Sequence, residues 1–239
     1  VWQGAVPTGP GMWSGRGGAP PGNAATTRWR PLVLARASAL RPAPPPAFGS
    51  PAFDSALAEV RHVARTRTPE QAASARRWAL RPPAGYWNAV AVRALVAARA
   101  SEAEAARVLG LVNAALFDAG IACWDAKLHY WLLRPSQADS TVTFPDSVGL
   151  PNFPAYPSGH ACGGGAVAEA LGTLVPGARA AVEREAAEGA LSRLYAGVHY
   201  RFDNDTGLAL GRRVARAVLA ADARGAFGPA AAWRPAGDG

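Results

Sequence analysis

Lysine is nearly absent from this chain. Of its 25 basic residues, 24 are arginine, and Lys127 is the single lysine. The formal net charge of +8 is compatible with nucleic acid, but the arginines are scattered along the chain and form no basic segment. We therefore expect no nucleic-acid partner. One lysine kept among so many arginines indicates a specific role for Lys127.

Cysteine, long apolar runs and strand-forming residues are also scarce. Cys123 and Cys162 are too few for a disulfide framework, although they could form one bridge. No run of 18 apolar residues occurs without charges or helix breakers, so we expect no membrane span. Alanine dominates and β-branched residues are sparse, which favours an all-α fold.

The N-terminus gives little information on the compartment. Val1 is not a start methionine, and no charged-then-apolar leader is visible. The chain is therefore expected to be a processed mature form or a trimmed one. We expect a soluble protein, and both export and homodimer formation stay open.

The composition divides the chain into an irregular arm, a helical domain and a short tail. Residues 1–50 are rich in glycine and proline, and the run Arg41–Pro46 cannot be helical. We expect three tryptophans to fix this arm to the body, at Trp2, Trp13 and Trp29. Residues 51–225 are expected to form one helical bundle, followed by a tail over 226–239.

Capping signals and apolar spacing predict the helices of the bundle. Proline follows Ser50 and Thr68 at two expected helix starts, and Ser101 with Glu104 forms a capping box. The expected helices cover 51–65, a short segment from 69, 86–100, 101–133, 158–174, 178–196 and 203–222. Four prolines predict a loop over 136–157.

Two basic residues near the end of the long helix are the first candidates for a site. Lys127 and Arg134 are seven residues apart, almost two helical turns, so one continuous helix would place both on the same face. Two such cations repel each other unless an anion lies between them. Trp124 and Trp131 form a neighbouring stripe that could wall the site. The alternative is an ordinary basic stripe on the surface.

A second candidate precedes the helix expected at 158–174. Helix starts expose unpaired N–H groups and bind anions readily, and Ser158 adds a hydroxyl donor. Gly159 allows close approach to the backbone, and His160 can exchange a proton near neutral pH. Phe153 adds an apolar wall. The alternative is a solvated loop histidine.

The third candidate lies around two helix boundaries near the C-terminus. Arg193 is a further cation. His199 and Asp203 are four residues apart, so a helical turn would bring the carboxylate to the imidazole and raise the basicity of its other nitrogen. Such an imidazole can act as a nucleophile or bind a metal oxyanion. An i,i+4 surface ion pair is the alternative.

Together the three segments suit a tetrahedral or trigonal-bipyramidal oxyanion with several negative charges. They resemble the three-part signature shared by type-2 phosphatidic acid phosphatases, bacterial class A acid phosphatases and vanadium-dependent haloperoxidases: Lys127-x6-Arg134-Pro135, Pro157-Ser158-Gly159-His160 and Ser192-Arg193-x5-His199-x3-Asp203. The flanks Phe153–Tyr156 and Gly197–Asp203 are most similar to the haloperoxidase branch.

The resemblance implies two alternative chemistries for one pocket. In the haloperoxidases, vanadate is bonded to the histidine matching His199, and the residue matching His160 handles protons while peroxide oxidises halide for an organic acceptor. In the phosphatases, the same two positions attack phosphorus and protonate the leaving alcohol of a phosphate or diphosphate ester, without a cofactor. The resemblance also implies that the oxyanion is held by five residues, matching Lys127, Arg134, Ser158, Gly159 and Arg193. An anion-binding domain without catalysis is a third alternative.

One departure from the family pattern concerns an acidic residue after a Trp-Ala pair. Here Trp78-Ala79 continues into Leu80-Arg81-Pro82-Pro83, without the acid or its glycine-containing loop. In the family that acid helps to position the arginines. We therefore expect Arg134 and Arg193 to be held by another carboxylate, by backbone carbonyls or by the bound anion alone.

Overall fold

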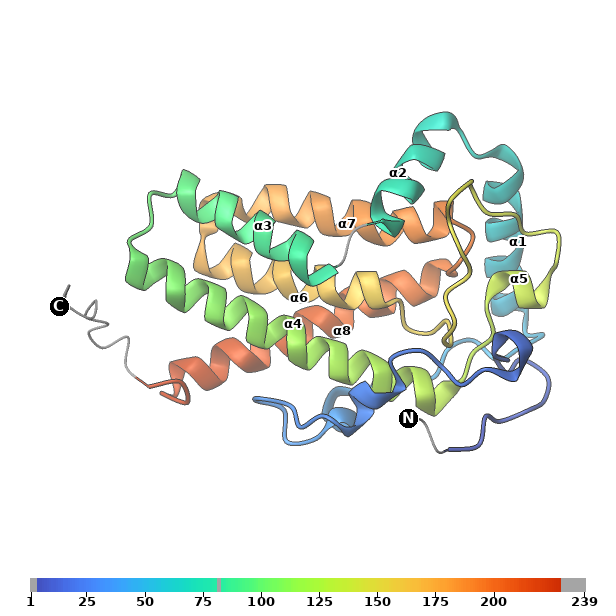
Figure 1. Ribbon diagram of the computed structural model, residues 1–239, viewed down its shortest axis with the longest axis horizontal. Coiled ribbons are helices and arrows are strands. Elements are labelled where there is room, and N and C mark those ends of the chain that lie inside the picture. Colours follow the sequence, from blue (N-terminus) through green and yellow to red (C-terminus); the bar gives the residue numbers. More distant parts are fainter. Residues whose placement is uncertain (1–3, 81–82, 229–239) are drawn as a thin grey trace.

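The computed structural model describes residues 4–80 and 83–228, which form an all-α bundle with a long N-terminal arm (Figure 1). The helices are α1 (Pro51–Thr66), α2 (Pro69–Ala79), α3 (Pro83–Ala97), α4 (Glu102–Tyr130), α5 (Pro135–Ala138), α6 (Gly159–Leu174), α7 (Arg179–Tyr195) and α8 (Arg201–Ala223). No strand occurs in these two ranges; Met12 and Leu132 form one isolated bridge.

The predicted caps start the helices as expected. Ser50 accepts the N–H of Phe53 at the start of α1, and complete capping boxes open α2 at Thr68 and α4 at Ser101. Each cap satisfies N–H groups that have no partner inside the helix. The local sequence therefore determines where these three helices begin.

Several predicted boundaries were wrong, and α3 covers Pro83–Ala97 where a helix over 86–100 was expected. Helix α4 ends at Tyr130 and not at Leu133, because Trp131 adopts a left-handed conformation with φ 51° and its N–H closes the last turn on Lys127. The segment expected as a loop over 136–157 begins with the short helix α5, capped by Gln137 at Arg134. Gly110 and Gly120 do not interrupt α4, although each costs about 1 kcal/mol relative to alanine.

The core of the bundle lies around α6, which packs against α4, α7 and α8 (Figure 1). Its neighbours approach closely because the contacts are made by glycines. A Cβ added to Gly165 would lie 2.3 Å from the carbonyl oxygen of Leu208, and one added to Gly211 would lie 2.1 Å from that of Cys162. No side chain fits between α6 and α8 at these positions, so their separation is fixed.

The arm is attached to the bundle by several buried contacts. Trp13 is buried and its ring centroid lies 6.0 Å from that of Trp131, while Trp29 stacks on Phe117 at 5.7 Å. The buried carboxylate of Asp118 on α4 accepts the N–H groups of three consecutive arm residues, Leu32, Val33 and Leu34. The arm, which carries three short 3-10 helices, is therefore ordered against α4. Trp2 lies outside the described residues.

Within the described ranges, α4 is long and apolar enough to cross a membrane, with a mean hydropathy of 1.5 over its most apolar window. Of that window, 56% is buried inside the protein. Because core helices of bundles pass the same test of length and composition, this is weak evidence for a membrane span. Of the predicted tail, only 226–228 belong to the described residues.

Candidate active site

One end of the bundle brings together the three segments that the sequence singled out. The C-terminal ends of α4 and α7, the N-terminal ends of α6 and α8, and the segments before α5 and α6 meet there (Figure 1). Six of the predicted oxyanion-binding and catalytic residues are buried at this end, at most 4% exposed: Lys127, Arg134, Ser158, Arg193, His199 and Asp203. Gly159, which is partly exposed, opens α6 beside them.

Lys127 lies in the last turn of α4 with all three of its ammonium protons engaged. Its Nζ donates to the backbone oxygens of Pro154 at 2.9 Å, Ala155 at 2.8 Å and Pro157 at 2.5 Å. These carbonyls lie in the segment before α6, where the prolines prevent a helix and leave carbonyl groups unpaired. The lysine therefore fixes that segment and adds a buried positive charge beneath it.

Arg134 reaches the site by a different route from the one predicted. It lies beyond the end of α4, in extended conformation at the start of α5, so it does not share a helical face with Lys127. Its Nε donates to Phe153 O at 2.9 Å, and its Nη1 donates to Val198 O at 2.7 Å and to His199 Nε2 at 3.0 Å. Its buried Nη2 has no partner.

His199 and Asp203 form the expected i,i+4 pair. Nδ1 of His199 lies 2.8 Å from Oδ2 of Asp203, which also accepts the N–H of Tyr200. The carboxylate places the imidazole proton on Nδ1 and directs the lone pair of Nε2 towards Arg134. Gly197, with φ 73°, turns the chain between α7 and this pair. Burial and then the nearby cations keep the pKa of His199 well below its usual value.

His160 lies in the first turn of α6. Its Nε2 lies 3.1 Å from the carbonyl oxygen of Trp78, and only a protonated nitrogen can donate there. Nδ1 is therefore the ring nitrogen that remains to exchange a proton. Burial, reinforced by the charge of Arg193, lowers the pKa of His160 to about 3. The imidazole is thus neutral at pH 7 until a negative charge binds nearby and raises its pKa.

Backbone carbonyls and a hydroxyl take the place of the missing acid. Arg193 donates from Nε to the hydroxyl of Ser192 at 3.0 Å and from Nη2 to Ala75 O at 2.7 Å. Backbone carbonyls hold Arg134 as well. Of the three expected alternatives (another carboxylate, backbone carbonyls or the bound anion alone), the structure shows backbone carbonyls at both arginines. The stretch that departs from the family includes Arg81 and Pro82, which lie outside the described residues.

Positive charge is in excess in this buried region. Lys127, Arg134 and Arg193 face a single carboxylate, Asp203, whose pKa burial raises to about 7 against the opposing effect of Lys127. Burial lowers the pKa of Lys127 to about 8, that of Arg134 to about 9 and that of Arg193 to about 10. Such shifts mean that the charged forms lack a counter-ion, which a bound anion would supply.

Two buried donors are available to that anion. Neither the Oγ of Ser158 nor the Nη2 of Arg134 has a hydrogen-bond partner, although both atoms are fully buried. Buried polar groups are almost always paired, so unpaired donors beside an excess of positive charge fit a tetrahedral oxyanion. Among the described residues, no group of three His, Cys, Asp or Glu side chains could bind a metal cation.

Of the aromatic residues predicted to line the site, Trp124 and Phe153 lie beside it and Trp131 does not. Trp124 and Phe153 pack together at 5.2 Å, and the Nζ of Lys127 lies 5.8 Å and 5.2 Å from their respective ring centroids. Trp131 does not continue the Trp124 stripe, because the left-handed turn at the end of α4 directs its ring towards Trp13 of the arm. It supports the arm and not the stripe that we expected.

The sequence analysis did not identify the groups that hold the charged residues in place. These are the carbonyls of Ala75, Trp78, Phe153, Pro154, Ala155, Pro157 and Val198 and the hydroxyl of Ser192. The prolines before α6 were the available signal, because they leave carbonyls free. Cys123 and Cys162 are buried and free, and no bridge joins them.

The fold places the chain in a class of all-α proteins, that of the vanadium haloperoxidases and related acid phosphatases. Residues 107–224 match the family model of the PAP2 superfamily. Over this part the chain is similar to the PAP2 superfamily, and its fold resembles that of the vanadium-dependent haloperoxidases. No curated protein matches the sequence.

Solved structures agree with this assignment. A bacterial vanadium-dependent iodoperoxidase superposes with a TM-score of 0.79 and 27% identity over 90% of this chain. A holo bacterial vanadium-dependent chloroperoxidase superposes with a TM-score of 0.66 and 17% identity over 84% of this chain. An apo form superposes with a TM-score of 0.66 and 16% identity over 90% of this chain. These two structures show similarity of fold. The chain spans 61%, 55% and 61% of the three proteins respectively.

Proposed function

We propose that this protein is an enzyme that binds vanadate at His199 and oxidises halide with hydrogen peroxide. The observation that carries the proposal is the excess of buried positive charge around a histidine whose other nitrogen is held by a carboxylate. A surface ion pair or a solvated loop histidine would not be buried among three cations. The iodoperoxidase, at 27% identity, favours the same chemistry.

The residues present have separate tasks in this proposal. Asp203 keeps the proton of His199 on Nδ1, which leaves Nε2 to bind vanadate. Because Nε2 now accepts a hydrogen bond from Arg134, the N–H of that arginine must turn from the imidazole to the anion when vanadate binds, and the guanidinium keeps its charge. Arg134 Nη2 and Ser158 Oγ supply further donors, and Arg193 supplies charge. Bound vanadate would supply a Lewis acid that activates peroxide.

His160 is the residue that would move a proton in this site. Its Nε2–H is held by Trp78 O, so Nδ1 exchanges the proton. With a pKa of about 3 in the empty site, it can accept a proton only after a multiply charged anion has raised that value. This coupling would restrict proton transfer to the loaded enzyme.

Hydrolysis of phosphate or diphosphate esters is the second candidate. The same geometry favours it, because Nε2 of His199 could attack phosphorus while His160 protonates the leaving alkoxide, giving a phosphohistidine that water then hydrolyses. The absence of the family's acidic residue, with both arginines held by carbonyls, distinguishes this site from the haloperoxidase pattern. The organic acceptor or the alcohol part of the ester would contact Trp124 and Phe153.

One set of measurements tests these candidates together. Vanadate and phosphate should each stabilise the protein, by about 2.7 kcal/mol at a hundredfold excess over Kd. Vanadate-loaded protein should then oxidise bromide or iodide in the presence of peroxide, in parallel with an assay of p-nitrophenyl phosphate hydrolysis. Hydrolysis without halide oxidation would replace the haloperoxidase proposal with the phosphatase one. A melting temperature indifferent to both anions would contradict an oxyanion site and would favour neither enzyme.

A further inference from the structure

A groove runs along α4 on the side covered by the N-terminal arm. Its volume is about 670 Å³, and it lies between arm residues 23–32, Ala84 at the start of α3 and the face of α4 from Gly110 to Trp124. None of the described residues that line it carries a charge. A groove of this size without charged residues suits an uncharged organic molecule.

Two large apolar side chains that line the groove, Trp29 and Leu32, are more than half exposed in the described chain. Trp29 stacks on Phe117 with an angle of 6° between the rings, yet 51% of its surface is exposed. Leu32 beside it is 62% exposed. Large apolar residues that stay exposed together mark a binding surface.

Two glycines keep the floor of the groove open. Gly110 and Gly120 lie inside the 29-residue helix α4, and a Cβ added to either would meet no atom within 4 Å. Packing inside the protein therefore does not require them, in contrast to Gly165 and Gly211 between α6 and α8. In the groove, the missing side chains leave space for a flat molecule to approach the helix.

On the α4 face of the groove, the polar side chain of Asn113 has little hydrogen-bonding capacity to spare. Asn113 donates from Nδ2 to Asn88 Oδ1 and to Leu109 O, and its Oδ1 accepts a hydrogen bond from Asn88. On this face, an occupant would therefore make apolar and aromatic contacts more than hydrogen bonds.

Trp124 connects the groove to the oxyanion site. Its ring lines the groove, and it also lies 3.4 Å from the position of a Cβ added to Gly159. Its Nε1 donates to Gly22 O at 3.2 Å, which ties the ring to the arm. A molecule that stacks on Trp124 from the groove is thus one ring away from the first residue of α6.

We infer that this groove binds the uncharged, flat aromatic part of the substrate beside the oxyanion site. The inference rests on the proposed function and adds a substrate class to it. An aromatic acceptor of halogen, or the aromatic alcohol of a phosphate ester, would lie against Trp29, Phe117 and Trp124. The glycine floor gives it access to the backbone of α4.

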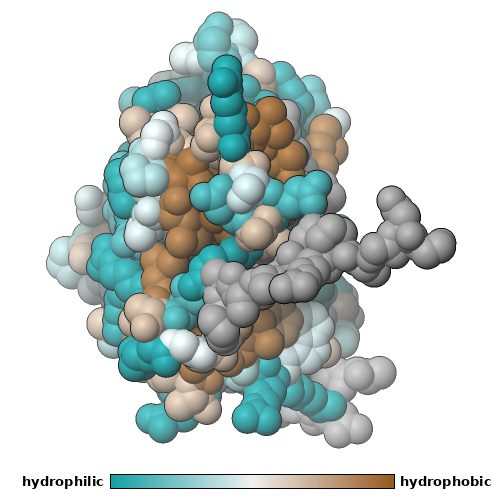
Figure 2. All heavy atoms as spheres, turned by 90° about the vertical axis from the view of Figure 1, so that its left-hand side faces the viewer, coloured by the Kyte–Doolittle hydropathy of each residue, from teal (hydrophilic) through white to brown (hydrophobic). Residues whose placement is uncertain are grey.

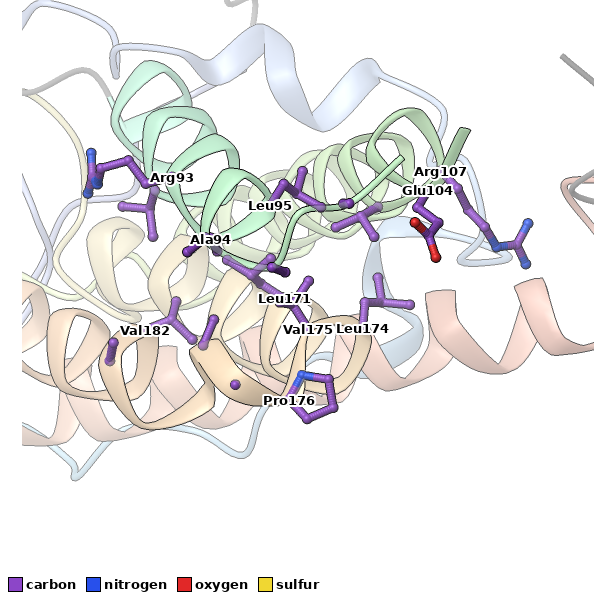
Figure 3. Close-up of a pocket in the computed structure, with 18 of the residues that line it drawn as sticks. Arg93, Ala94, Leu95, Glu104, Arg107, Leu171, Leu174, Val175, Pro176 and Val182 are labelled. Carbon is purple, nitrogen blue, oxygen red and sulfur yellow. The ribbon is translucent and has the colours of Figure 1, made fainter. Parts of the chain in front are cut away.

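A larger cavity, of about 750 Å³, does not have these properties. It lies at the opposite end of the bundle between α3, α4, α6 and α7, and four charged residues line it: Arg93, Glu104, Arg107 and Glu185 (Figure 3). Figure 2 shows that end of the molecule, with apolar surface between hydrophilic residues. It serves as the internal control, because it is a comparable space remote from the oxyanion site.

The inference is tested by filling each cavity in turn. Gly120→Leu should place a side chain in the groove, and Gly177→Leu should place one in the control cavity, where a Cβ likewise meets no atom within 4 Å. 2-Naphthol, uncharged and flat, is the probe, titrated by calorimetry and by tryptophan fluorescence. Phosphate affinity is measured on the same samples.

Gly120→Leu should weaken 2-naphthol binding at least tenfold, and Gly177→Leu should change it less than twofold. Phosphate should bind both variants as it binds the wild type, which also shows that they are folded. If Gly120→Leu loses phosphate as well, Gly110→Leu and Trp29→Ala take its place. Unchanged 2-naphthol affinity in these groove variants, or loss in Gly177→Leu, would overturn the groove. Failure of phosphate to bind the wild type would instead contradict the proposed function.

Discussion

The two ends of the bundle are built from the same helices with opposite chemistry. At the end where α6 begins, Lys127, Arg134 and Arg193 are buried together and held by backbone carbonyls. At the end where α6 finishes, Leu171 and Val175 pack in an apolar cluster beside a cavity. Burying charge costs folding free energy, and burying hydrocarbon is favourable. Burial at the apolar end therefore offsets the cost of the buried charges at the other end.

Substitution of the two histidines should give the largest effect at the charged end. His160→Ala should lower turnover by about 10² to 10⁴-fold, the usual contribution of a general acid or base, while the anion stays bound. His199→Ala should abolish covalent attachment of the anion. Turnover and equilibrium binding of vanadate or phosphate are measured for both variants. An empty site in the His160 variant would contradict this division of tasks.

At the apolar end, Leu171→Ala should cost about 2 to 5 kcal/mol of unfolding free energy, because it removes a fully buried side chain. Denaturant unfolding gives this value. Phosphate affinity should be unchanged, since Leu171 lies at the end of α6 remote from the oxyanion site. A large loss of affinity in this variant would show that the two ends are coupled.

Lys127→Met should weaken anion binding; the prediction concerns affinity for the anion and not specificity for the halide or the ester. Removing one preorganised charge should weaken phosphate binding by about 2 to 4 kcal/mol. A calorimetric titration measures the loss, with Leu171→Ala as the matched variant of a buried residue elsewhere on the same bundle. Equal affinity in the Lys127 variant and the wild type would remove the lysine from the site.

The smallest predicted effect is a dependence of anion binding on pH. Burial lowers the pKa of Lys127 to about 8 in the empty site, so above that pH the lysine must take up a proton when an anion binds. As the pH rises above about 8, the affinity should therefore decrease, with a limiting slope of about tenfold (about 1.4 kcal/mol) per pH unit. Sulfate is the probe because it stays a dianion. The slope should be shallower in Lys127→Met.

The sequence was sufficient to predict an all-α fold and three capped helix starts, but not the geometry of the candidate site. Caps at Ser50, Thr68 and Ser101 are local, so they could be identified along the chain. The end of α4 could not, because the left-handed turn at Trp131 is stabilised by its contact with Trp13 of the distant arm. Tertiary contact overrode the helical pattern there.

The same limit applies to the residues that hold the site together. The spacing of His199 and Asp203 predicted their hydrogen bond, although His199 lies before the N-cap of α8 and Asp203 in its first turn, so the pair spans the helix start and not a helical turn. The carbonyl partners of Lys127 and Arg193 carry no signal in residue type, since every residue has a carbonyl. Only the prolines before α6 indicated that acceptors would be free in that segment.

The glycine contacts between α6 and α8 have a consequence for how natural or random variants would be interpreted. Gly165 and Gly211 admit no side chain, and the two helices they join carry His160 and Asp203 in their first turns. A methyl group added there would push the helices apart and move His160 away from Asp203, which orients His199. In a survey of inactive variants, these two residues would rank with the histidines, although neither takes part in the chemistry.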